Sequence, residues 1–527
     1  SVNGVPIFIR GGDWGLDEGL KRIPHERLEA QIRLHKLANL NLIRNWVGQS
    51  TNEDFYELCD KYGLLLWDEF FQPNPGDGPN PTDIETYIAN VRDKILRYRN
   101  HPSIALWCAR NEGYPPEEID TLLRKLMAEL EPTRRYQPSS TDGNGVRSSG
   151  PYWWRTPREF YNITDDYFKT ETGSVSVPTL ESIKGMMPEK DLHSINDDWA
   201  EHDFAKGNSG SEKYPAQISE RYGRFRNLAD FVRKSQMANY EAYRAMYEGR
   251  NAKMFHPTTA VITWMSNPAQ PSFVWQLYHY DFEPMASLYA VMHASEMLHI
   301  QLNEATGEVQ VINNLPAPQS GLTARIHVYA LDGAVAYQHE SPVNAAASSV
   351  SSAGLLDFAA SATQFVQLEL VDENGKVIST NFYWRGTATH PDDLTDLDKL
   401  PSVALKVTAS RKDDENRRVI TVTIENPTAQ IAVLTHLQLR RARTGDRVLP
   451  AYASDNYISL APHQSRTVTL EAALDQFNGE DALVTVDGWN TTVQPASFKG
   501  VAVAPNVDAD PMHSPDTGFA WATEGLR

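Results

Sequence analysis

The sequence contains few of the residues that metal centres, disulfide scaffolds and nucleic-acid surfaces need. Only Cys59 and Cys108 are cysteines, and two cysteines make neither a disulfide framework nor a tetrahedral metal site. The 15 histidines show no metal-ligand spacing such as HExxH, so we expect no metal and no cofactor. The 68 acidic residues outnumber the 49 basic ones. Because a phosphate backbone needs a basic face, this balance argues against a nucleic-acid partner.

Long hydrophobic runs are also missing. No stretch of 18 consecutive apolar residues exists, so we predict no membrane span. The sequence shows no signal peptide, but it opens on a turn that leads directly into the apolar run 6–12. This opening predicts that an upstream part is missing. The location therefore stays open, and we expect a periplasmic or secreted protein if that part carried a signal peptide.

The first 300 residues alternate short apolar runs with helical patterns. The apolar runs span 6–12, 40–46, 64–70 and 104–112, and the helical patterns between them span 25–38, 52–62 and 81–99. Repeated strand–helix units predict parallel strands joined by crossover helices, as in the first half of a (β/α)8 barrel. The second half is less regular. We expect strands at 135–143, 166–173 and 260–267, another strand within 150–165, and helices at 228–248 and 284–298.

After residue 300 the pattern changes to alternating β-rich segments broken by Asp-Gly, Asn-Gly and Pro turns. Segments of this kind predict two immunoglobulin-like β-sandwiches. The expected fold class is α/β plus all-β, in which a TIM barrel is followed by two sandwiches. The predicted domains are a barrel at 1–300, sandwiches at 301–395 and 396–505, and a tail at 506–527.

Polar and aromatic residues follow the predicted barrel strands. The carboxyl ends of barrel strands form one rim, where the active sites of such barrels lie. The candidates on this rim are Asp13, Trp14, Arg44, Trp46, Asp68, Glu69, Asn111, Glu112, Glu171, Trp264 and Asn267. Indole rings stack on the C–H faces of sugars, and carboxylate, amide and guanidinium groups bind hydroxyls. The sequence therefore predicts a carbohydrate site.

Each of these residues also has a plainer interpretation. Glycoside cleavage needs two carboxyl groups, about 5 Å apart in retaining enzymes, and Glu112 and Glu171 are the candidate pair. Taken alone, Glu112 could simply end a strand. Asp68 and Glu69 could be structural, and the tryptophans could be core residues. Arg44 more often holds a nucleophilic carboxylate than a sugar.

Six motifs in order resemble the catalytic domain of glycoside hydrolase family 2. They are VNGVPIFIRGGDW, NLNLIRNWVG, YGLLLWDEFF, RNHPSIALWCARNE, TETGSVSVP and VITWMSNPAQPSFVWQL. The resemblance is strongest to β-mannosidases, mannosylglycoprotein endo-β-mannosidases and exo-β-D-glucosaminidases. It implies a retaining double displacement with Glu171 as nucleophile and Glu112 as acid/base. It also implies that Asn111 holds the sugar 2-hydroxyl. Family members carry a jelly-roll and a further β-sandwich before the barrel, so the resemblance leads us to expect that the missing upstream part holds both and acts as a partner of this chain.

The substrate prediction depends on the residue pair after the fourth strand. Exo-glucosaminidase relatives carry a Ser-Asp type pair, whereas this chain has Asn111-Glu112, which favours a β-mannoside or an N-glycan-type oligosaccharide. GPYWW and ERYGRFRNLADFVRKSQ nevertheless resemble the glucosaminidases. An exo-β-D-glucosaminidase and another β-glycosidase such as a β-galactosidase therefore remain alternatives. A carbohydrate-binding pseudoenzyme is the non-enzyme alternative, and exo or endo action stays open.

Overall fold

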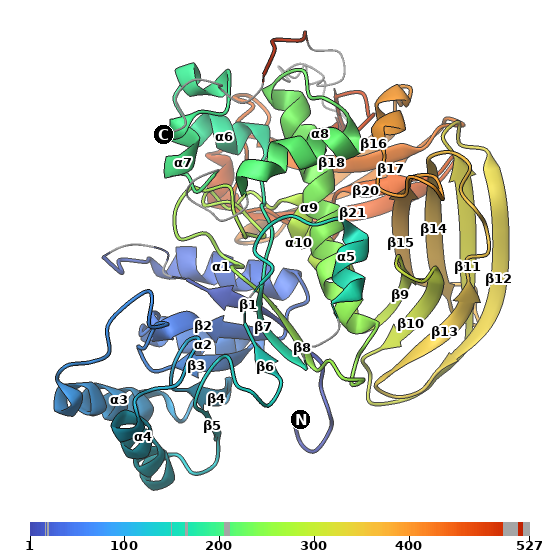
Figure 1. Ribbon diagram of the computed structural model, residues 1–527. Helices are drawn as coiled ribbons and strands as arrows, with labels where there is room; N and C mark the ends of the chain where they lie inside the picture. Colours follow the sequence, from blue (N-terminus) through green and yellow to red (C-terminus); the bar gives the residue numbers. More distant parts are fainter. Residues whose placement is uncertain are drawn as a thin grey trace.

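The computed structural model describes residues 1–15, 17, 20–148, 150–163, 167–204, 211–498 and 515–519 (Figure 1). The chain forms an α/β barrel, and two antiparallel β-sandwiches follow it. The fold class predicted from the sequence is therefore confirmed. No helix within the described part of the chain has the length and apolar character to cross a membrane.

The barrel sheet has eight strands in the order β5-β4-β3-β2-β1-β8-β7-β6, and all its neighbours are parallel. Its strands are β1 (Ile9–Trp14), β2 (Leu42–Asn45), β3 (Leu65–Glu69), β4 (Ile104–Cys108), β5 (Arg135–Gln137), β6 (Val146–Arg147), β7 (Phe168–Thr172) and β8 (Ala260–Thr263). Because β1 pairs with both β2 and β8, the first and last strands are neighbours, as barrel closure requires. The polar residues that follow several strands therefore lie at one end of the sheet.

Helices connect these strands and cover the sheet. They are α1 (His25–Leu37), α2 (Glu53–Tyr62), α3 (Ile84–Tyr98), α4 (Glu117–Leu130), α5 (Pro157–Asn162), α6 (Leu180–Met186), α7 (Asp197–Glu201), α8 (Tyr214–Tyr222), α9 (Leu228–Asn251) and α10 (Ala286–Ala294). Local signals fix several ends. The Asn52 side chain accepts a hydrogen bond from the Asp54 amide at the start of α2, and Gly63 ends that helix in the left-handed conformation.

The strand expected within 150–165 is a wrong prediction. The sixth strand is the two-residue β6, which precedes that range, and the range itself contains α5 with a proline at its first position. Helix α9 also continues to Asn251, past the Gly249 at which the sequence predicts its end. Gly249 lies against the backbone of Phe160 on α5, 2.8 Å from the position of an added Cβ. The glycine therefore permits close packing of the two helices instead of ending α9.

The first sandwich packs a sheet of β13-β10-β9 against a sheet of β12-β11-β14-β15. Its strands are β9 (Leu298–Asn303), β10 (Glu308–Asn313), β11 (Gln319–Ala330), β12 (Val335–Ala345), β13 (Ser349–Leu355), β14 (Gln364–Val371) and β15 (Val377–Arg385). Alternate residues of β11 are buried, as a strand with one face on a core requires.

The second sandwich has sheets in the orders β19-β21-β17-β16-β24 and β20-β18-β22-β23. Its strands are β16 (Lys406–Asp413), β17 (Arg417–Glu425), β18 (Ala432–Arg441), β19 (Tyr452–Ala453), β20 (Ile458–Leu460), β21 (Ser465–Ala473), β22 (Ala482–Asp487), β23 (Gln494–Pro495) and β24 (Ser497–Phe498). Most of the predicted tail at 506–527 lies outside the described residues. Within 515–519, Phe519 is buried and its ring lies 5.9 Å from Trp199 and 5.6 Å from Phe231.

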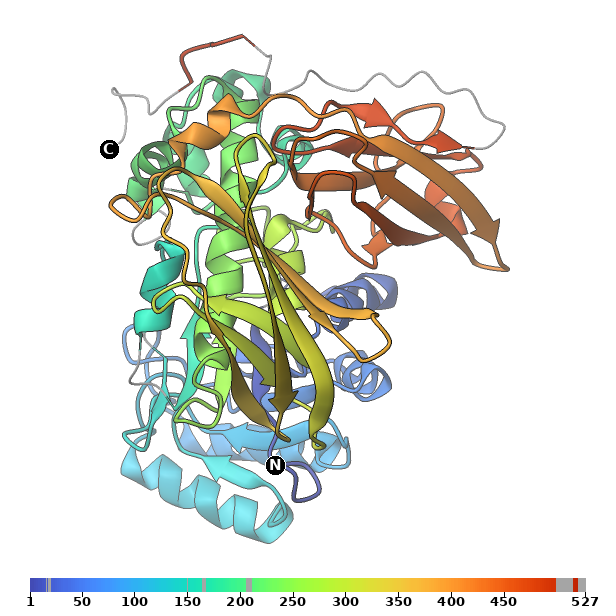
Figure 2. The same ribbon diagram turned by 90° about the vertical axis from the view of Figure 1, so that its right-hand side faces the viewer.

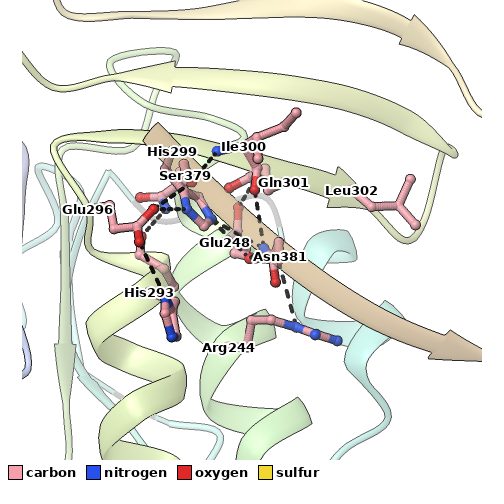
Figure 3. Close-up of polar contacts among 12 residues, drawn as sticks. Arg244, Glu248, His293, Glu296, His299, Ile300, Gln301, Leu302, Ser379 and Asn381 are labelled. Atoms are coloured by element: carbon pink, nitrogen blue, oxygen red, sulfur yellow. Dashed lines mark hydrogen bonds and ion pairs between the residues drawn. The ribbon is translucent and has the colours of Figure 1, made fainter. Parts of the chain in front are cut away.

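Helix α9 runs between the barrel sheet and the first sandwich, as both views show (Figures 1 and 2). A chain of alternating acidic and histidine side chains lies near one end of this helix, and Figure 3 shows four of its members, Glu248, His299, Glu296 and His293. Glu248 of α9 lies 3.0 Å from one nitrogen of His299, whose other nitrogen lies 3.2 Å from Glu296. Glu296 also lies 3.2 Å from His293, which contacts Asp455 of the second sandwich at 2.9 Å.

Burial and pairing act in opposite directions on these groups. Burial disfavours the charged form of each histidine, but the effect of the neighbouring carboxylates is larger. They raise the pKa of His293 well above its usual value. The pKa of His299 is also raised. Against burial, hydrogen bonds from the two histidines lower the pKa of Glu296 to about 2, and His299 and Arg244 lower the pKa of Glu248. The network is therefore an ionised clamp between the domains.

We predict that this clamp makes stability decline in alkaline solution. A histidine with a raised native pKa stabilises the fold fully below its unfolded pKa of about 6.5, and this contribution is lost as the pH rises through the native pKa. At pH 6, His293→Gln should reduce the free energy of unfolding by roughly 3–5 kcal/mol, the usual cost of breaking a buried ion pair. The thermal midpoint should fall accordingly. The variant should also lose much of the decline in the thermal midpoint above pH 6.5, as thermal unfolding at a fixed heating rate would reveal.

The exposed His339 provides the control, since its replacement by glutamine should leave the pH profile unchanged. If the thermal midpoints of the wild type and the His293 variant changed with pH in parallel, the stabilising role of this ion-pair network would be contradicted.

Candidate active site

Arg44 of β2 lies at the centre of the barrel end and is completely buried. Its Nε donates to Glu69 Oε1 at 2.6 Å, and its Nη1 donates to Glu171 Oε1 at 2.7 Å. Its Nη2 donates to Asn111 Oδ1 at 2.6 Å. One rigid guanidinium therefore connects side chains from β3, β7 and the end of β4 through charge-assisted bonds. Burial opposes its charge, but the surrounding carboxylates raise the pKa of Arg44 well above its usual value.

Glu171, on β7, has a hydrogen bond to each carboxylate oxygen. Arg44 binds Oε1, and the Tyr152 hydroxyl donates to Oε2 at 2.6 Å. Burial raises the pKa of Glu171, Arg44 lowers it, and the nearby Glu112 carboxylate raises it. The net direction is upward. Glu171 is thus fixed in orientation and lies close enough to Glu112 for the two charges to interact.

Glu112 lies in a sharp turn after β4 and is partly exposed. Its φ of 46° is in the left-handed region, which costs a residue with a side chain about 1–2 kcal/mol. Its backbone amide donates to Ser140 Oγ at 2.9 Å, and Asn74 Nδ2 donates to its carboxylate at 3.2 Å. The turn therefore presents this carboxyl group at the surface next to the buried Glu171.

Asn111 immediately precedes this turn. Its Oδ1 accepts from Arg44 and also from Ser140 Oγ at 3.1 Å, while its backbone amide donates to the Gln72 carbonyl at 2.9 Å. Because two donors occupy the amide oxygen, the orientation of the side chain is defined, and its NH2 group can serve as a donor to a ligand.

Three of the predicted sugar-binding residues are fully buried, and a sugar contact for them stays a prediction. Trp14 is 0% exposed, packs between His35 and Phe55, and donates from Nε1 to Ser50. Asp68 and Asp13 are also 0% exposed.

The buried carboxylates differ in their partners. Asp68 accepts hydrogen bonds from Asn45, Tyr56 and Lys94, which account for its charge within the protein. Asp13 Oδ1 lies 3.2 Å from Arg44 Nη1. Among the described residues, no side chain or backbone amide donates a hydrogen bond to the Asp13 carboxylate. Burial raises the pKa of Asp13 well above its usual value, and Glu171 and Glu69 add to the rise against Arg44.

Glu69 and Asn267 are also buried and bonded to the protein, and a sugar contact for them likewise stays a prediction. Glu69 accepts from Arg44, from Trp67 Nε1 at 3.0 Å, and from the Val47 amide at 2.7 Å. Asn267 forms hydrogen bonds to both backbone polar groups of Gly15, at 2.9 and 3.1 Å. Glu69 therefore holds Arg44, and Asn267 fixes the loop after β1.

Partly exposed aromatic rings remain around Glu171. Trp46 and Trp264 meet edge to face with centroids 5.0 Å apart, and Trp264 lies 6.5 Å from Tyr152 and 6.1 Å from Trp275. Trp275 donates from Nε1 to the Tyr152 carbonyl at 2.7 Å. Of the predicted site residues, Glu112, Trp46 and Trp264 keep exposed surface next to the buried Glu171, Asn111 and Arg44.

Three contacts of the two glutamates were not predicted from the sequence: Tyr152 with the Glu171 carboxylate, Asn74 with the Glu112 carboxylate, and Ser140 with the Glu112 backbone amide. Tyr152 lies in the GPYWW segment. This segment follows the strand predicted at 135–143, and that position was the signal in the sequence that could have indicated Tyr152. Ser140 lies within the same predicted strand. Within the described residues, no group of three His, Cys, Asp or Glu side chains has an arrangement that could hold a metal ion.

A separate cavity of about 700 Å³ lies between the barrel and the second sandwich. Side chains of α6, α9, β18 and β22 line it, including Glu181, Arg233, His436 and Arg440. None of the predicted site residues does.

Three family models match the chain. They describe the TIM barrel domain of family 2 glycosyl hydrolases at residues 1–170, a mannosidase Ig/CBM-like domain at 306–388, and the Ig-fold domain of exo-β-D-glucosaminidase at 381–491. The second and third matches fall on the two sandwiches.

Curated relatives match nearly the whole chain. A mannosylglycoprotein endo-β-mannosidase of Lilium longiflorum is 27% identical, over 93% of this chain and 63% of its own length. An exo-β-D-glucosaminidase of Streptomyces avermitilis is 30% identical, over 94% of this chain and 60% of its own length. The chain thus spans about three fifths of these relatives.

The crystal structure of an Amycolatopsis orientalis exo-chitosanase is 25% identical and superposes with a TM-score of 0.86. The match covers 94% of this chain and 64% of that one. The barrel matches the family 2 model, and the sandwiches match Ig-like models named for a mannosidase and an exo-β-D-glucosaminidase. The chain therefore belongs to glycoside hydrolase family 2.

Proposed function

We propose that the chain is the catalytic part of a retaining glycoside hydrolase that cleaves β-mannosides through a covalent glycosyl-enzyme. The observation that carries this proposal is the pair Glu171 and Glu112. Arg44 and Tyr152 hold the first on both oxygens, and the second is close enough to raise its pKa. Two carboxyl groups that lie near each other are what double displacement at a sugar requires.

Glu171 is the nucleophile in this proposal. The Arg44 and Tyr152 hydrogen bonds favour its ionised form against burial, and a proton on Glu112 removes the repulsion between the two carboxylates. In the first step, a bond forms between a Glu171 oxygen and the anomeric carbon. The bond to the departing oxygen breaks, and Glu112 gives that oxygen its proton.

Glu112 then acts as the general base. It takes a proton from water as the water oxygen attacks the anomeric carbon, and the Glu171 carboxylate leaves. The two carboxylates have the exposures that these roles need. Glu112 is partly exposed and can meet both the departing group and water, whereas Glu171 is 3% exposed.

Asn111 supports the choice of a β-mannoside. With its Oδ1 occupied by Arg44 and Ser140, its NH2 group donates to the sugar 2-hydroxyl. A glucosaminide carries a cationic amine at that carbon, and the same donor would repel it. The lily relative is named an endo-β-mannosidase.

An exo-β-D-glucosaminidase is the second candidate. The second sandwich matches the exo-β-D-glucosaminidase Ig-fold model, and the Streptomyces relative carries that name. The choice between the sugars therefore depends on measured turnover.

The proposed function first predicts the turnover of a panel of aryl β-glycosides, including mannoside, glucosaminide, galactoside and glucuronide. The mannoside should be cleaved fastest. Glu171→Gln should reduce that rate more than about 10³-fold, because the amide cannot form the covalent intermediate.

Glu118→Gln, on the exposed face of α4, is the matched control and should change nothing. Fastest cleavage of the glucosaminide would replace the proposed sugar. Undiminished turnover by the Glu171 variant would overturn the nucleophile.

The second prediction concerns stereochemistry. Proton NMR of the reaction should show the β-anomer of the sugar first, with the α-anomer growing later by mutarotation, because two inversions at the anomeric carbon restore its configuration. Initial appearance of the α-anomer would mean a direct attack by water and would rule out the covalent step.

A further inference from the structure

Two consecutive serines, Ser139 and Ser140, follow β5 and contact the turn that carries Glu112. Ser140 Oγ accepts the Glu112 amide at 2.9 Å and donates to Asn111 Oδ1 at 3.1 Å. Ser139 Oγ accepts the next amide, that of Gly113, at 3.2 Å. Both serines are 0% exposed. Each hydroxyl therefore serves the backbone of the turn, and neither is free to bind a ligand.

The turn needs such partners because its backbone is in an unusual conformation. Glu112 has a φ of 46° and Gly113 a φ of 125°, and both values leave the extended path of β4. A residue with a side chain adopts the left-handed region only where its surroundings hold it there. Here the two serine hydroxyls accept consecutive amides of the turn, so they fix the conformation that aims the Glu112 side chain.

Ser140 is itself held between the strands that carry the two carboxylates. Its amide donates to the Arg110 carbonyl at 3.0 Å, and its carbonyl accepts from Thr170 Oγ1 at 3.0 Å. Thr170 immediately precedes Glu171 on β7. The position of Ser140 is therefore defined relative to both Glu171 and Glu112.

We propose that Ser140, supported by Ser139, is a positioning residue that sets the placement of the Glu112 carboxyl group relative to Glu171. This inference rests on the proposed acid/base role of Glu112. Loss of the Ser140 hydroxyl leaves Asn111 Oδ1 with its 2.6 Å bond from Arg44. The sugar contact should therefore survive, and the loss should fall on proton delivery to the departing oxygen.

The test is Ser140→Ala with a series of aryl glycosides that differ in leaving group. A dinitrophenol leaves without protonation, whereas a methylphenol needs the acid. The kcat/KM for the methylphenyl glycoside should fall about 10- to 100-fold, because a misplaced acid loses part of the roughly 10²–10⁴-fold that general acid catalysis contributes. The kcat/KM for the dinitrophenyl glycoside should fall less than about threefold. The alkaline limb of the pH profile with the methylphenyl substrate should shift as well, while KM changes little.

Two further variants make the result specific. Ser139→Ala removes the acceptor of the Gly113 amide, together with the bonds of this hydroxyl to the Thr141 backbone, and leaves the Ser140 contacts in place. It should show the same selectivity at a smaller size, about three- to tenfold for the methylphenyl glycoside. It also tests the inference if Ser140→Ala does not fold. Ser235→Ala, a fully buried serine of α9 away from the turn, is the control and should affect all substrates alike.

The outcomes separate this inference from the proposed function. Equal losses for both leaving groups in the Ser140 and Ser139 variants, with an active wild type, would overturn the positioning role alone. No turnover of any glycoside by the wild type would overturn the proposed function and this inference with it.

Discussion

The active site depends on one buried positive charge. The Arg44 guanidinium lies within ion-pair distance of Asp13, Glu69 and Glu171, and it also binds Asn111. Three carboxyl groups around one cation would leave excess negative charge in a buried place. The pKa of Asp13 is raised well above its usual value, which favours its neutral form and reduces that excess. Arg44 thereby orients the proposed nucleophile and the proposed sugar-binding amide together.

The rest of the molecule holds this array in place from outside. Residues at the ends of β1, β3, β4 and β7 contact Arg44 of β2 because parallel barrel strands end at one rim. Lys94, on α3, neutralises Asp68 beside it, and α9 fastens the barrel to both sandwiches through the chain of histidines and carboxylates. The sandwiches therefore contribute to the rigidity of the barrel without supplying any residue described in the site.

Much of the fold could be predicted from the sequence, whereas the burial and the protein partners of the predicted site residues could not. The barrel could be predicted because each strand and helix has its own local pattern of apolar residues, and their alternation indicates parallel strands. Whether Asp68 is bonded to the protein depends on Tyr56 and Lys94, which come from helices before and after its strand. Whether the Trp14 ring is buried depends on His35 and Phe55. Such neighbours are set by packing, so a polar residue at a strand end is equally consistent with a ligand contact and a buried support.

The central claim is that Glu171, held by Arg44, attacks the sugar. Incubation with an activated 2-deoxy-2-fluoro β-glycoside of the sugar that is cleaved should trap the intermediate, because the fluorine slows its hydrolysis more than its formation. Peptide mass spectrometry should then find one fluorosugar per chain, attached to Glu171. A label on another residue, or turnover without any label, would contradict the account.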